Sequence, residues 1–497
     1  MDLLAFEHHL LSPQGRDRIP VDAAVASVGG FDCCDQVRLG VVLEDGAVRD
    51  AGFQAEGCGA ATAAASAAVA LVRGRSVLEA ARVGPDQIAA ELGGLSSAKH
   101  HAAELAADAL ARALGYAVRR AQVVPAAPGR TLVAMSGGVD SAVAALLCSR
   151  RRDTVAVTLE LWADTENDGE RSCCSASAVS QARRLAQSMG LPHLTLDLRR
   201  EFRAGVVEPF ISGYAGGETP NPCVGCNGHV RIDAMLDMAD RLGCERLATG
   251  HYARLAEADD PRGPLLRVAA DPAKDQTYML AALAPRTLAR MTFPLGELRK
   301  PEVRAIAADA GLPVADKVDS QDLCFLAGTT RQRFLARHGG VSQRLGEIVD
   351  TDGQLLGHHQ GQHNYTVGQR RGLCVPSAEP LYVLSKDAGT NQVIVGPRAA
   401  LYTERVALRA VVLRRSGARV SSVKLRYRSR PLPGRLVGSP EAGRPGPVEV
   451  ALREPADAAA PGQLACLMDG ELVIGTGTIT AALPAERRRP EAEKLIA

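Results

Sequence analysis

One short segment, Ser136-Gly137-Gly138-Val139-Asp140-Ser141, constrains the fold of this 497-residue chain more than any other feature of its sequence. An apolar stretch precedes it at 131–135, and a helical stretch, AVAALLCSRR, follows it. The glycines let the backbone approach an anion closely, and the first turn of the helix offers unpaired N–H groups beside two serine hydroxyls. The segment therefore predicts a phosphate-binding turn between a buried strand and a helix. It is not a Walker P-loop, because no Gly-Lys-Ser/Thr follows it.

The same order of strand, turn and helix continues along the chain. TVAVTLELW at 154–162 and PHLTLDL at 192–198 predict strands, and VSQARRLAQSMG at 179–190 predicts a helix that stops at its glycine. Strands that alternate with helices indicate a parallel sheet with helices on both faces. Such sheets bind ligands at the carboxyl ends of their strands.

The flanking regions follow different patterns. Before the parallel region, Asp45-Gly46 predicts a hairpin turn, an Ala-rich helix ends at Gly74, and a second helix spans His100 to Arg120. A Pro/Gly linker follows at 123–130. After about residue 335 short strands with Asp-Gly and Thr-Asn turns predict two small β-rich units.

Composition narrows the class of protein. A formal charge of +2 gives no global attraction to nucleic acid or membrane, and 3% aromatic residues with Trp162 as sole tryptophan disfavour carbohydrate cradles and base-stacking platforms. Residues 398–435 hold eleven Lys/Arg and one acid, Glu404. This excess is either a solvated basic face or a surface that contacts a phosphate backbone. We see no secretory signal and no run of about 18 uncharged apolar residues, so we expect a cytoplasmic protein with no membrane partner.

Twelve cysteines are too few for a disulfide scaffold in a chain of this length. Cys223 and Cys226 form a C-x-x-C in TPNPCVGCN, and Cys324 lies in a similarly polar setting, DSQDLCFL. A C-x-x-C is a zinc half-site, a redox pair, part of an iron-sulfur site or an unoccupied structural pair. Three thiols without a second C-x-x-C suit persulfide chemistry or a cluster with one open iron. We assign no catalytic role to Cys173 and Cys174, and we expect four others to be buried as small apolar residues: Cys148, Cys244, Cys374 and Cys466.

A series of motifs carries a resemblance to a known family. SGGVDS, TPNPCVGCN, ATGHYAR, KDQTYML, DSQDLCFL, YTVGQRRGL and APGQLACLMDGELVIGTGTI occur in the order found in MnmA-type tRNA-specific 2-thiouridylases. The resemblance covers about residues 130 to 480. These enzymes belong to the PP-loop ATP pyrophosphatases, which adenylate a substrate oxygen and release pyrophosphate.

The resemblance implies specific binding residues. Asp140 would help to hold Mg²⁺ and pyrophosphate, Cys226 matches the family's nucleophile, and Cys324 matches its second catalytic cysteine. Cys223 stands where many members carry Asp, which favours a three-cysteine cluster and leaves the identity of the base open. The residues implied to cradle ATP are Ala134, Met135, Ser136, Gly137, Gly138, Val139, Asp140, Ser141, Leu159 and Gly250. Those implied to contact the target uridine or the rest of the tRNA are Asn221, Pro222, Cys223, His251, Lys274, Asp275, Gln276, Arg426, Tyr427 and Gln463.

The implied reaction uses ATP and Mg²⁺ to adenylate the C2 oxygen of the wobble uridine, after which sulfur replaces AMP. The sulfur comes either from a persulfide, with Cys226 and Cys324 closing a disulfide, or from a 4Fe-4S cluster held by Cys223, Cys226 and Cys324. The implied partners are tRNA and a cysteine desulfurase or another sulfur donor. Two other hypotheses are an iron-sulfur carrier whose PP-loop region only binds nucleotide or RNA, and a PP-loop enzyme that thiolates another substrate.

The N-terminal region has a separate resemblance, to NifU/IscU-type iron-sulfur scaffolds. FEHHLLSPQGR, Cys33-Cys34-Asp35, the run from Gly57 to Ala61 and the run from Lys99 to Leu105 carry it. That family holds a transient cluster or zinc with three cysteines and an aspartate. Cys33, Asp35 and Cys58 match, whereas His101 stands at the place of the third cysteine, and imidazole replaces thiolate on iron in Rieske centres. The alternative is a degenerate domain kept for docking.

These patterns predict a multidomain α/β and α+β protein. We expect a NifU/IscU-like α+β domain at 1–122 and a PP-loop domain with a doubly wound parallel sheet at 130–335. A small β-rich domain at 336–400, a C-terminal β-barrel at 401–480 and a tail at 481–497 follow. We expect the short linker to tether the first domain near the thiolation site, where it would deliver a cluster, iron or sulfur.

Overall fold

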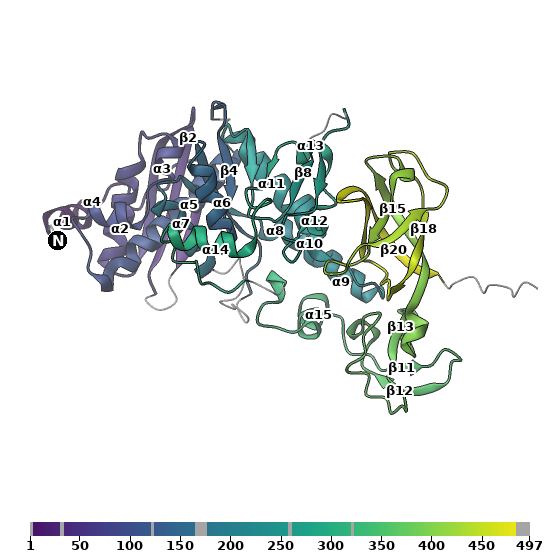
Figure 1. Cartoon of the computed structure of the whole chain (residues 1–497). Coiled ribbons are helices and arrows are strands. Elements are labelled where there is room, and N and C mark those ends of the chain that lie inside the picture. The colour runs from purple at the N-terminus through teal and green to yellow at the C-terminus, as the bar shows by residue number, and fades with distance from the viewer. Residues whose placement is uncertain are drawn as a thin grey trace, which may run out of the picture.

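The computed structural model describes residues 3–29, 34–120, 124–164, 176–256, 261–319 and 323–483. Figure 1 shows its parts in a row, from the purple N-terminal unit through the parallel-sheet unit to the yellow barrel, with the green central unit beside the barrel. We use N-terminal unit for residues 3–120, parallel-sheet unit for 124–339, central unit for 346–396 and barrel for 402–483. No helix of the described segments is long and apolar enough to cross a membrane.

The N-terminal unit is an antiparallel sheet with helices packed against it. Its strands lie in the order β1-β2-β3, and the predicted turn joins the last two, with φ of +51° at Asp45 and +75° at Gly46. The predicted helix from His100 to Arg120 is confirmed as α5. The strands are β1 (Ala24–Gly29), β2 (Gln36–Glu44) and β3 (Ala47–Glu56), and the helices are α1 (Leu3–Leu11), α2 (Gly59–Val72), α3 (Val77–Ala80), α4 (Pro85–Glu91), η1 (Ser97–Lys99) and α5 (His100–Arg120).

The parallel-sheet unit is doubly wound, as predicted. Its five strands lie in the order β10-β7-β4-β5-β6, and every neighbouring pair is parallel. The chain therefore builds outward from β4 in one direction and then from β7 in the other, so the strand order reverses between β4 and β7. Ligands of such sheets bind at this reversal, outside the carboxyl ends of the strands. The strands are β4 (Thr131–Ala134), β5 (Thr154–Glu160), β6 (His193–Asp197), β7 (Arg246–Ala248) and β10 (Met291–Thr292).

Helices and short helical turns connect these strands. The predicted helix before Gly190 is confirmed as α7. The elements are α6 (Val139–Ser149), α7 (Ala176–Ser188), α8 (Arg199–Phe202), η2 (Arg203–Val207), α9 (Glu208–Ala215), α10 (Pro222–Gly225), η3 (Cys226–Arg231), α11 (Ile232–Arg241), α12 (Thr277–Leu280), α13 (Pro285–Leu288), α14 (Lys300–Asp309), η4 (Cys324–Leu326) and α15 (Arg331–Gly339).

The C-terminal third consists of two β-rich units. The central unit is a four-stranded sheet in the order β12-β11-β14-β13, and in the barrel β15 pairs with both β18 and β20, which closes the sheet. A hairpin of the parallel-sheet unit, β8 (Arg254–Ala256) and β9 (Leu265–Arg267), adds to β20 and so joins the barrel to that unit. The other strands are β11 (Gly346–Val349), β12 (Leu355–His359), β13 (Tyr382–Asp387), β14 (Gln392–Gly396), β15 (Tyr402–Leu413), β16 (Ser422–Lys424), β17 (Leu432–Leu436), β18 (Val448–Asp457), β19 (Leu464–Asp469) and β20 (Leu472–Leu483), and the short turns are η5 (Gln362–Asn364), η6 (Arg398–Leu401) and η7 (Gly417–Arg419).

The N-terminal unit packs directly against the parallel sheet, in addition to its connection through the linker. Helix α5 lies against β6, and one hydrophobic cluster runs without a break from the N-terminal unit into the parallel-sheet unit. Tyr116 donates to Asp197 at 3.2 Å, and Arg119 pairs with Glu201 at 2.8 Å. The linker is therefore not the only connection between the two units, because this interface fixes the first unit against the sheet edge.

A buried ion network lies within this interface. Asp108 of α5 pairs with Arg183 of α7 and, at 3.2 Å, with Arg112, which in turn pairs with Glu160 of β5 at 2.6 Å. Burial alone would raise the pKa of Asp108, but the two arginines hold it below its usual value. Burial dominates at Glu160 and raises its pKa to about 7. Because removal of one partner would leave a buried charge unpaired, the network ties both units to one relative placement.

The basic stretch at 398–435 fits neither of its two predicted interpretations as a whole. Arg414 is buried and donates to the carbonyls of Ala281 and Leu283, while Arg415 donates to that of Gly263, so both fasten the barrel to the parallel-sheet unit. Burial lowers the pKa of Arg414 to about 10. Others pair with acids outside the stretch: Arg398 with Asp457, Arg405 with Glu449, Arg409 with Glu218, Arg419 with Asp469, Lys424 with Asp275 and Arg430 with Glu454.

We predict that Gly115→Ala loosens the docking of the N-terminal unit. A Cβ atom at Gly115 would lie 2.0 Å from the carbonyl oxygen of Thr195 in β6, so α5 would have to move away from the strand. We expect destabilisation of about 1–3 kcal/mol, together with faster amide hydrogen exchange in α5 and β6. Gly446→Ala is the matched control, because a Cβ there meets nothing within 4 Å. Equal exchange in the two variants would contradict the prediction.

Candidate functional site

The segment 136–141, which we call the glycine turn, connects β4 to α6 at the reversal of strand order. Gly137 has φ of +70°, and a Cβ there would lie 2.7 Å from the carbonyl oxygen of Ala178 in α7. The Ser141 hydroxyl accepts from the Ser136 amide at 3.1 Å and donates to the Gly138 carbonyl at 3.0 Å. These contacts fold the turn tightly over the N-terminus of α6, the arrangement that binds phosphate.

Gly250 lies against the glycine turn, although it follows a different strand, β7. A Cβ at Gly250 would lie 2.8 Å from the amide nitrogen of Ser141, so only glycine allows this approach. Leu159 lies near the carboxyl end of β5, the strand beside β4. The residues expected to cradle ATP are thus brought to one edge of the sheet.

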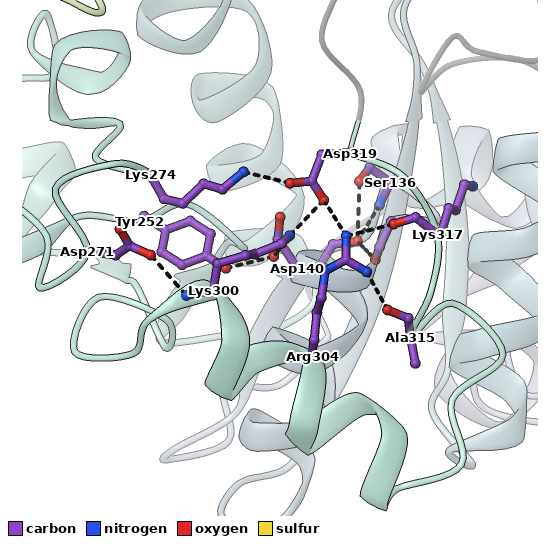
Figure 2. A network of polar contacts seen from close by, with 12 residues as sticks. Ser136, Asp140, Tyr252, Asp271, Lys274, Lys300, Arg304, Ala315, Lys317 and Asp319 are labelled. Atoms are coloured by element: carbon purple, nitrogen blue, oxygen red, sulfur yellow. Dashed lines mark hydrogen bonds and ion pairs between the residues drawn. The ribbon is translucent and has the colours of Figure 1, made fainter.

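Asp140 belongs to a polar network that the sequence analysis missed (Figure 2). Tyr252 and Lys300 both donate to Asp140 Oδ1, at 2.8 and 2.7 Å. Lys300 Nζ also lies 2.8 Å from Asp319 Oδ1, and Lys274 Nζ lies 2.7 Å from Asp319 Oδ2. No local spacing could have revealed this network, because its members come from segments up to about 180 residues apart.

Two further cations border the same network. Lys317 donates to the Gly137 carbonyl at 3.0 Å, and Arg304 pairs with Asp319 at 3.3 Å. Burial would raise the pKa of Asp319, but Lys274 and Lys300 lower it. Lys274, which the resemblance assigns to tRNA, therefore lies in the network around the glycine turn.

The three cysteines lie in three short helical elements, of which the first two are continuous. Cys223 lies in α10, where Asn221 caps the helix by accepting from the Cys223 amide at 3.1 Å. Cys226 begins η3 three residues later, and residues three apart lie on the same side of a helix. Cys226 is buried, whereas Cys223 and Cys324 are half-buried. Cys324 opens η4 and packs against the same hydrophobic cluster that contains Cys226.

An aromatic cluster anchors the turn that bears Cys324. The Phe325 ring is 5.0 to 5.8 Å, centroid to centroid, from the rings of Phe202, Phe210 and Phe334. Trp162, the sole tryptophan, packs against Phe202 and Phe334. Because it shares two rings with Phe325, its fluorescence reports on the packing around Cys324.

Several residues implied to contact tRNA have internal partners. Asp275 is buried, accepts from Thr277 and pairs with Lys424 at 3.3 Å, while Gln276 accepts from the Tyr252 amide. His251 contacts Thr249 at 2.8 Å, and burial lowers its pKa to about 3, so its ring is neutral near pH 7. These three residues shape the site from within.

Four of the other residues implied to contact tRNA lie where the barrel meets the segment that leads to Cys223. Pro222 opens α10, and Tyr427 packs against Tyr278 of the neighbouring helix α12. Arg426 donates to the Ala458 carbonyl, and Gln463 donates to the Thr219 carbonyl. Residues of the barrel therefore stand beside the segment that leads to Cys223.

A separate cluster lies in the N-terminal unit. Asp35 Oδ2 lies 3.1 Å from both Cys58 Sγ and His101 Nε2, and Asp35 Oδ1 accepts from the Cys58 amide at 2.7 Å. Across the described ranges, this is the only group of three or more His, Cys, Asp or Glu whose ligand atoms all lie within 4.8 Å of one another. A Cβ at Gly57 would lie 2.0 Å from Asp35 Oδ1, so glycine is required there. Cys33 lies outside the described residues.

The remaining cysteines fit the expectation with one exception. Cys148, Cys244 and Cys466 are buried, as predicted, and burial raises the pKa of each thiol. The prediction for Cys374 is wrong: it is exposed, with φ of +53°, because the chain turns at the surface there. Cys173 and Cys174 lie outside the described residues.

We predict that Gly250→Ala impairs nucleotide binding without unfolding the chain. The new methyl group would push the Ser141 amide and the Asp140 carbonyl carbon away from their positions, which distorts the glycine turn. We expect ATP affinity to fall at least about tenfold, measured by calorimetry. Circular dichroism should match that of Gly446→Ala, and unchanged ATP affinity would contradict the assignment of this turn.

Four family models match successive parts of the chain. They are described as NifU-like N terminal domain (7–123), tRNA methyl transferase HUP domain (129–328), tRNA methyl transferase PRC-barrel domain (332–397) and Aminomethyltransferase beta-barrel domain (409–479). The matches follow the N-terminal unit, the parallel-sheet unit, the central unit and the barrel in order.

Relatives resemble the chain along most of its length. Bifunctional protein NifU/MnmA of Rubrobacter xylanophilus is 42% identical over 486 residues, which cover 95% of this chain and 97% of the relative. tRNA-specific 2-thiouridylase MnmA of Geobacter metallireducens is 41% identical over 71% of this chain and 97% of its own length. The enzyme of that name from Methylorubrum extorquens is 44% identical over 70% of this chain and 93% of its own. The chain therefore belongs to the bifunctional NifU/MnmA family, in which a NifU-like domain precedes a tRNA-specific 2-thiouridylase.

Proposed function

We propose that the parallel-sheet unit and the barrel of this tRNA-uridine 2-sulfurtransferase convert the wobble uridine of tRNA to 2-thiouridine, using ATP and Mg²⁺. The observation that carries this proposal is the placement of the glycine turn and Gly250 at the reversal of strand order, with turns bearing Cys223, Cys226 and Cys324 in the same unit. An iron-sulfur carrier would not need a built phosphate turn. A cytoplasmic location fits this role.

The first step activates a poor leaving group. The uridine C2 oxygen attacks the α-phosphorus of ATP, the bond between the α- and β-phosphates breaks, and pyrophosphate leaves with the electron pair. The amides of the glycine turn and Mg²⁺ stabilise the charge that grows on the phosphates. Asp140 contributes a carboxylate beside the turn, where Lys300 and Tyr252 orient it.

The second step replaces AMP by sulfur at C2. In the persulfide version, the terminal sulfur on Cys324 attacks C2 and AMP leaves. The Cys226 thiolate then attacks the Cys324 sulfur, which closes a disulfide and leaves the terminal sulfur on the base. The burial of Cys226 supports this version, because its thiol lies among apolar side chains away from bulk water.

We propose the same three thiols as the ligands of a 4Fe-4S cluster. Cys223 and Cys226 share one side of a helical turn, and Cys324 supplies a third thiol from a separate, anchored turn. A donor set of three cysteines leaves one iron open. A bound cluster would supply sulfide from that iron. We favour this version, because Cys223 stands where many members of the family carry Asp.

The N-terminal unit is proposed to hold a transient iron-sulfur cluster or zinc. Asp35, Cys58 and His101 converge within ligand distance, and their thiol, imidazole and carboxylate suit either metal. The close fit of Gly57 against Asp35 and the convergence of the three ligands speak against a degenerate domain kept only for docking. The sulfur of such a cluster would come from a cysteine desulfurase or another sulfur donor.

Cys223→Asp is predicted to separate the two sulfur mechanisms. With a cluster, the variant loses one iron ligand, so bound iron and tRNA thiolation should both fall to below about 10% of wild type. With a persulfide, thiolation should survive, because Cys226 and Cys324 remain. Anaerobic purification, iron and sulfide quantitation, and thiolation with ATP and sulfide measure both quantities.

Cys226→Ser and Cys324→Ser should each reduce thiolation to below about 1% under either mechanism, and ATP affinity should stay within about twofold.

Cys58→Ala is predicted to remove metal from the N-terminal unit and to slow thiolation when the sulfur source is limiting. Loss of the thiolate leaves only Asp35 and His101 of the converging ligands. Metal content of the reconstituted full chain is the measurement, and Cys374→Ala is the control, because that cysteine is exposed and far from either site in the sequence. Unchanged metal content and turnover would reject the role of this unit.

A further inference from the structure

The network around Asp140 holds more cations than the proposed reaction has so far used. Lys274, Lys300 and Arg304 all contact Asp319 (Figure 2). Lys317 contacts the Gly137 carbonyl. These four cations and Asp319 all lie outside the glycine turn. They come from the segment before α12, from α14 and from the segment that follows α14.

Lys300 has the most constrained position in this set. Its side chain is 10% exposed, and its ammonium group lies between Asp140 Oδ1 at 2.7 Å and Asp319 Oδ1 at 2.8 Å. Its amide nitrogen, at the start of α14, donates to Asp271 Oδ2 at 3.0 Å. The backbone of Lys300 is thus fixed, while its side chain spans from the glycine turn to Asp319.

The charges of this region favour a further anion. The described residues that Figure 2 labels include four cations and three carboxylates. The cations are Lys274, Lys300, Arg304 and Lys317, and the carboxylates are Asp140, Asp271 and Asp319. Two of the ammonium groups reach the glycine turn directly, one at the Asp140 carboxylate and one at the Gly137 carbonyl. A polyphosphate bound to the turn would meet both groups at its edge.

We propose that Lys300 and Lys317 bind the β- and γ-phosphates that leave as pyrophosphate, and that Asp319 is a positioning residue that holds Lys300, Lys274 and Arg304 ready until phosphate oxygens replace it. This inference rests on the adenylation step of the proposed function. When the bond between the α- and β-phosphates breaks, the electron pair stays on the departing pyrophosphate oxygen. The ammonium groups stabilise that charge, and no oxidant, reductant or further reactant is involved.

Asp319 therefore competes with the phosphates for the same ammonium groups. Its oxygens accept from Lys274 and Lys300 at 2.7 to 2.8 Å, which is the geometry that a phosphate oxygen would need. Removal of a competitor strengthens binding, whereas removal of a merely structural carboxylate would weaken it. The two roles thus predict opposite changes in pyrophosphate affinity when the Asp319 carboxylate is removed.

Equilibrium binding of pyrophosphate to the full chain tests the proposal, by calorimetry with Mg²⁺ and without tRNA or a sulfur source. Lys300→Met should weaken pyrophosphate binding at least about tenfold and change AMP binding by less than about twofold. Lys300→Arg, which keeps the charge, should recover most of the loss. Lys424→Met is the matched control, because its ammonium is similarly buried, at 12% exposure, but pairs with Asp275, and it should leave pyrophosphate binding within about twofold.

Asp319→Asn decides between the two roles by the direction in which it changes the affinity for pyrophosphate. We expect pyrophosphate to bind at least about threefold more tightly than to wild type. Weaker binding in both Lys300→Met and Asp319→Asn would show a structural network and overturn the proposal, as would unchanged binding in Lys300→Met. Trp162 fluorescence verifies the fold, and if Lys300→Met misfolds, Lys317→Met at an exposed position must weaken pyrophosphate binding instead.

The outcome is independent of the thiolation assay. If wild type binds pyrophosphate as expected but never thiolates tRNA, the proposed function fails while the pyrophosphate site stands. If wild type thiolates tRNA but Lys300→Met binds pyrophosphate like wild type, the function stands and the site fails.

Discussion

The contact between Gly250 and the glycine turn is the constraint on which the functional part of this molecule depends. It joins the ends of β4 and β7, the two strands between which the strand order reverses. No side chain fits between the two segments there. Because β4 and β7 are parallel neighbours, their carboxyl ends meet at one edge, and the segments that follow them must share that edge. Tyr252, two residues after Gly250, then reaches Asp140. The polar network around the turn follows from this one close approach.

The docking of the N-terminal unit imposes a second constraint. A scaffold on a flexible linker would sample many positions, whereas α5 is held on β6 by apolar packing and by the Asp108, Arg112 and Arg183 network. Burying these charges costs free energy that the ion pairs offset, so a displaced unit would leave the arginines without their carboxylate partners. The position of His101 at the start of α5 is therefore fixed relative to the parallel sheet. Any transfer from this unit must cross a defined separation and cannot rely on a swinging domain.

Sequence patterns predicted the local parts of this structure well. The turn at Asp45-Gly46, the helix from His100 and the strands around the glycine turn depend on residues close in sequence, where periodicity and glycine positions carry the information. The convergence of Asp35, Cys58 and His101 followed from resemblance rather than from spacing. Lys300 and Asp319 could not be predicted, because a lysine before a proline in a helix start has no pattern that points to Asp140. Cys374 was misjudged, since apolar neighbours in the sequence did not imply burial at a surface turn.

The two cysteine sites differ in donor chemistry, which gives a direction to any exchange between them. The N-terminal site combines the Cys58 thiol with a carboxylate and an imidazole, and its other expected thiol, Cys33, lies outside the described residues. The proposed site of Cys223, Cys226 and Cys324 consists of thiols alone. Thiolates are the softer ligands and bind iron-sulfur clusters more strongly than carboxylate or imidazole does. Under the proposed function, a cluster or iron held first at the N-terminal site would bind more stably at the three cysteines, so fixed docking and unequal ligands would together favour transfer toward the thiolation site.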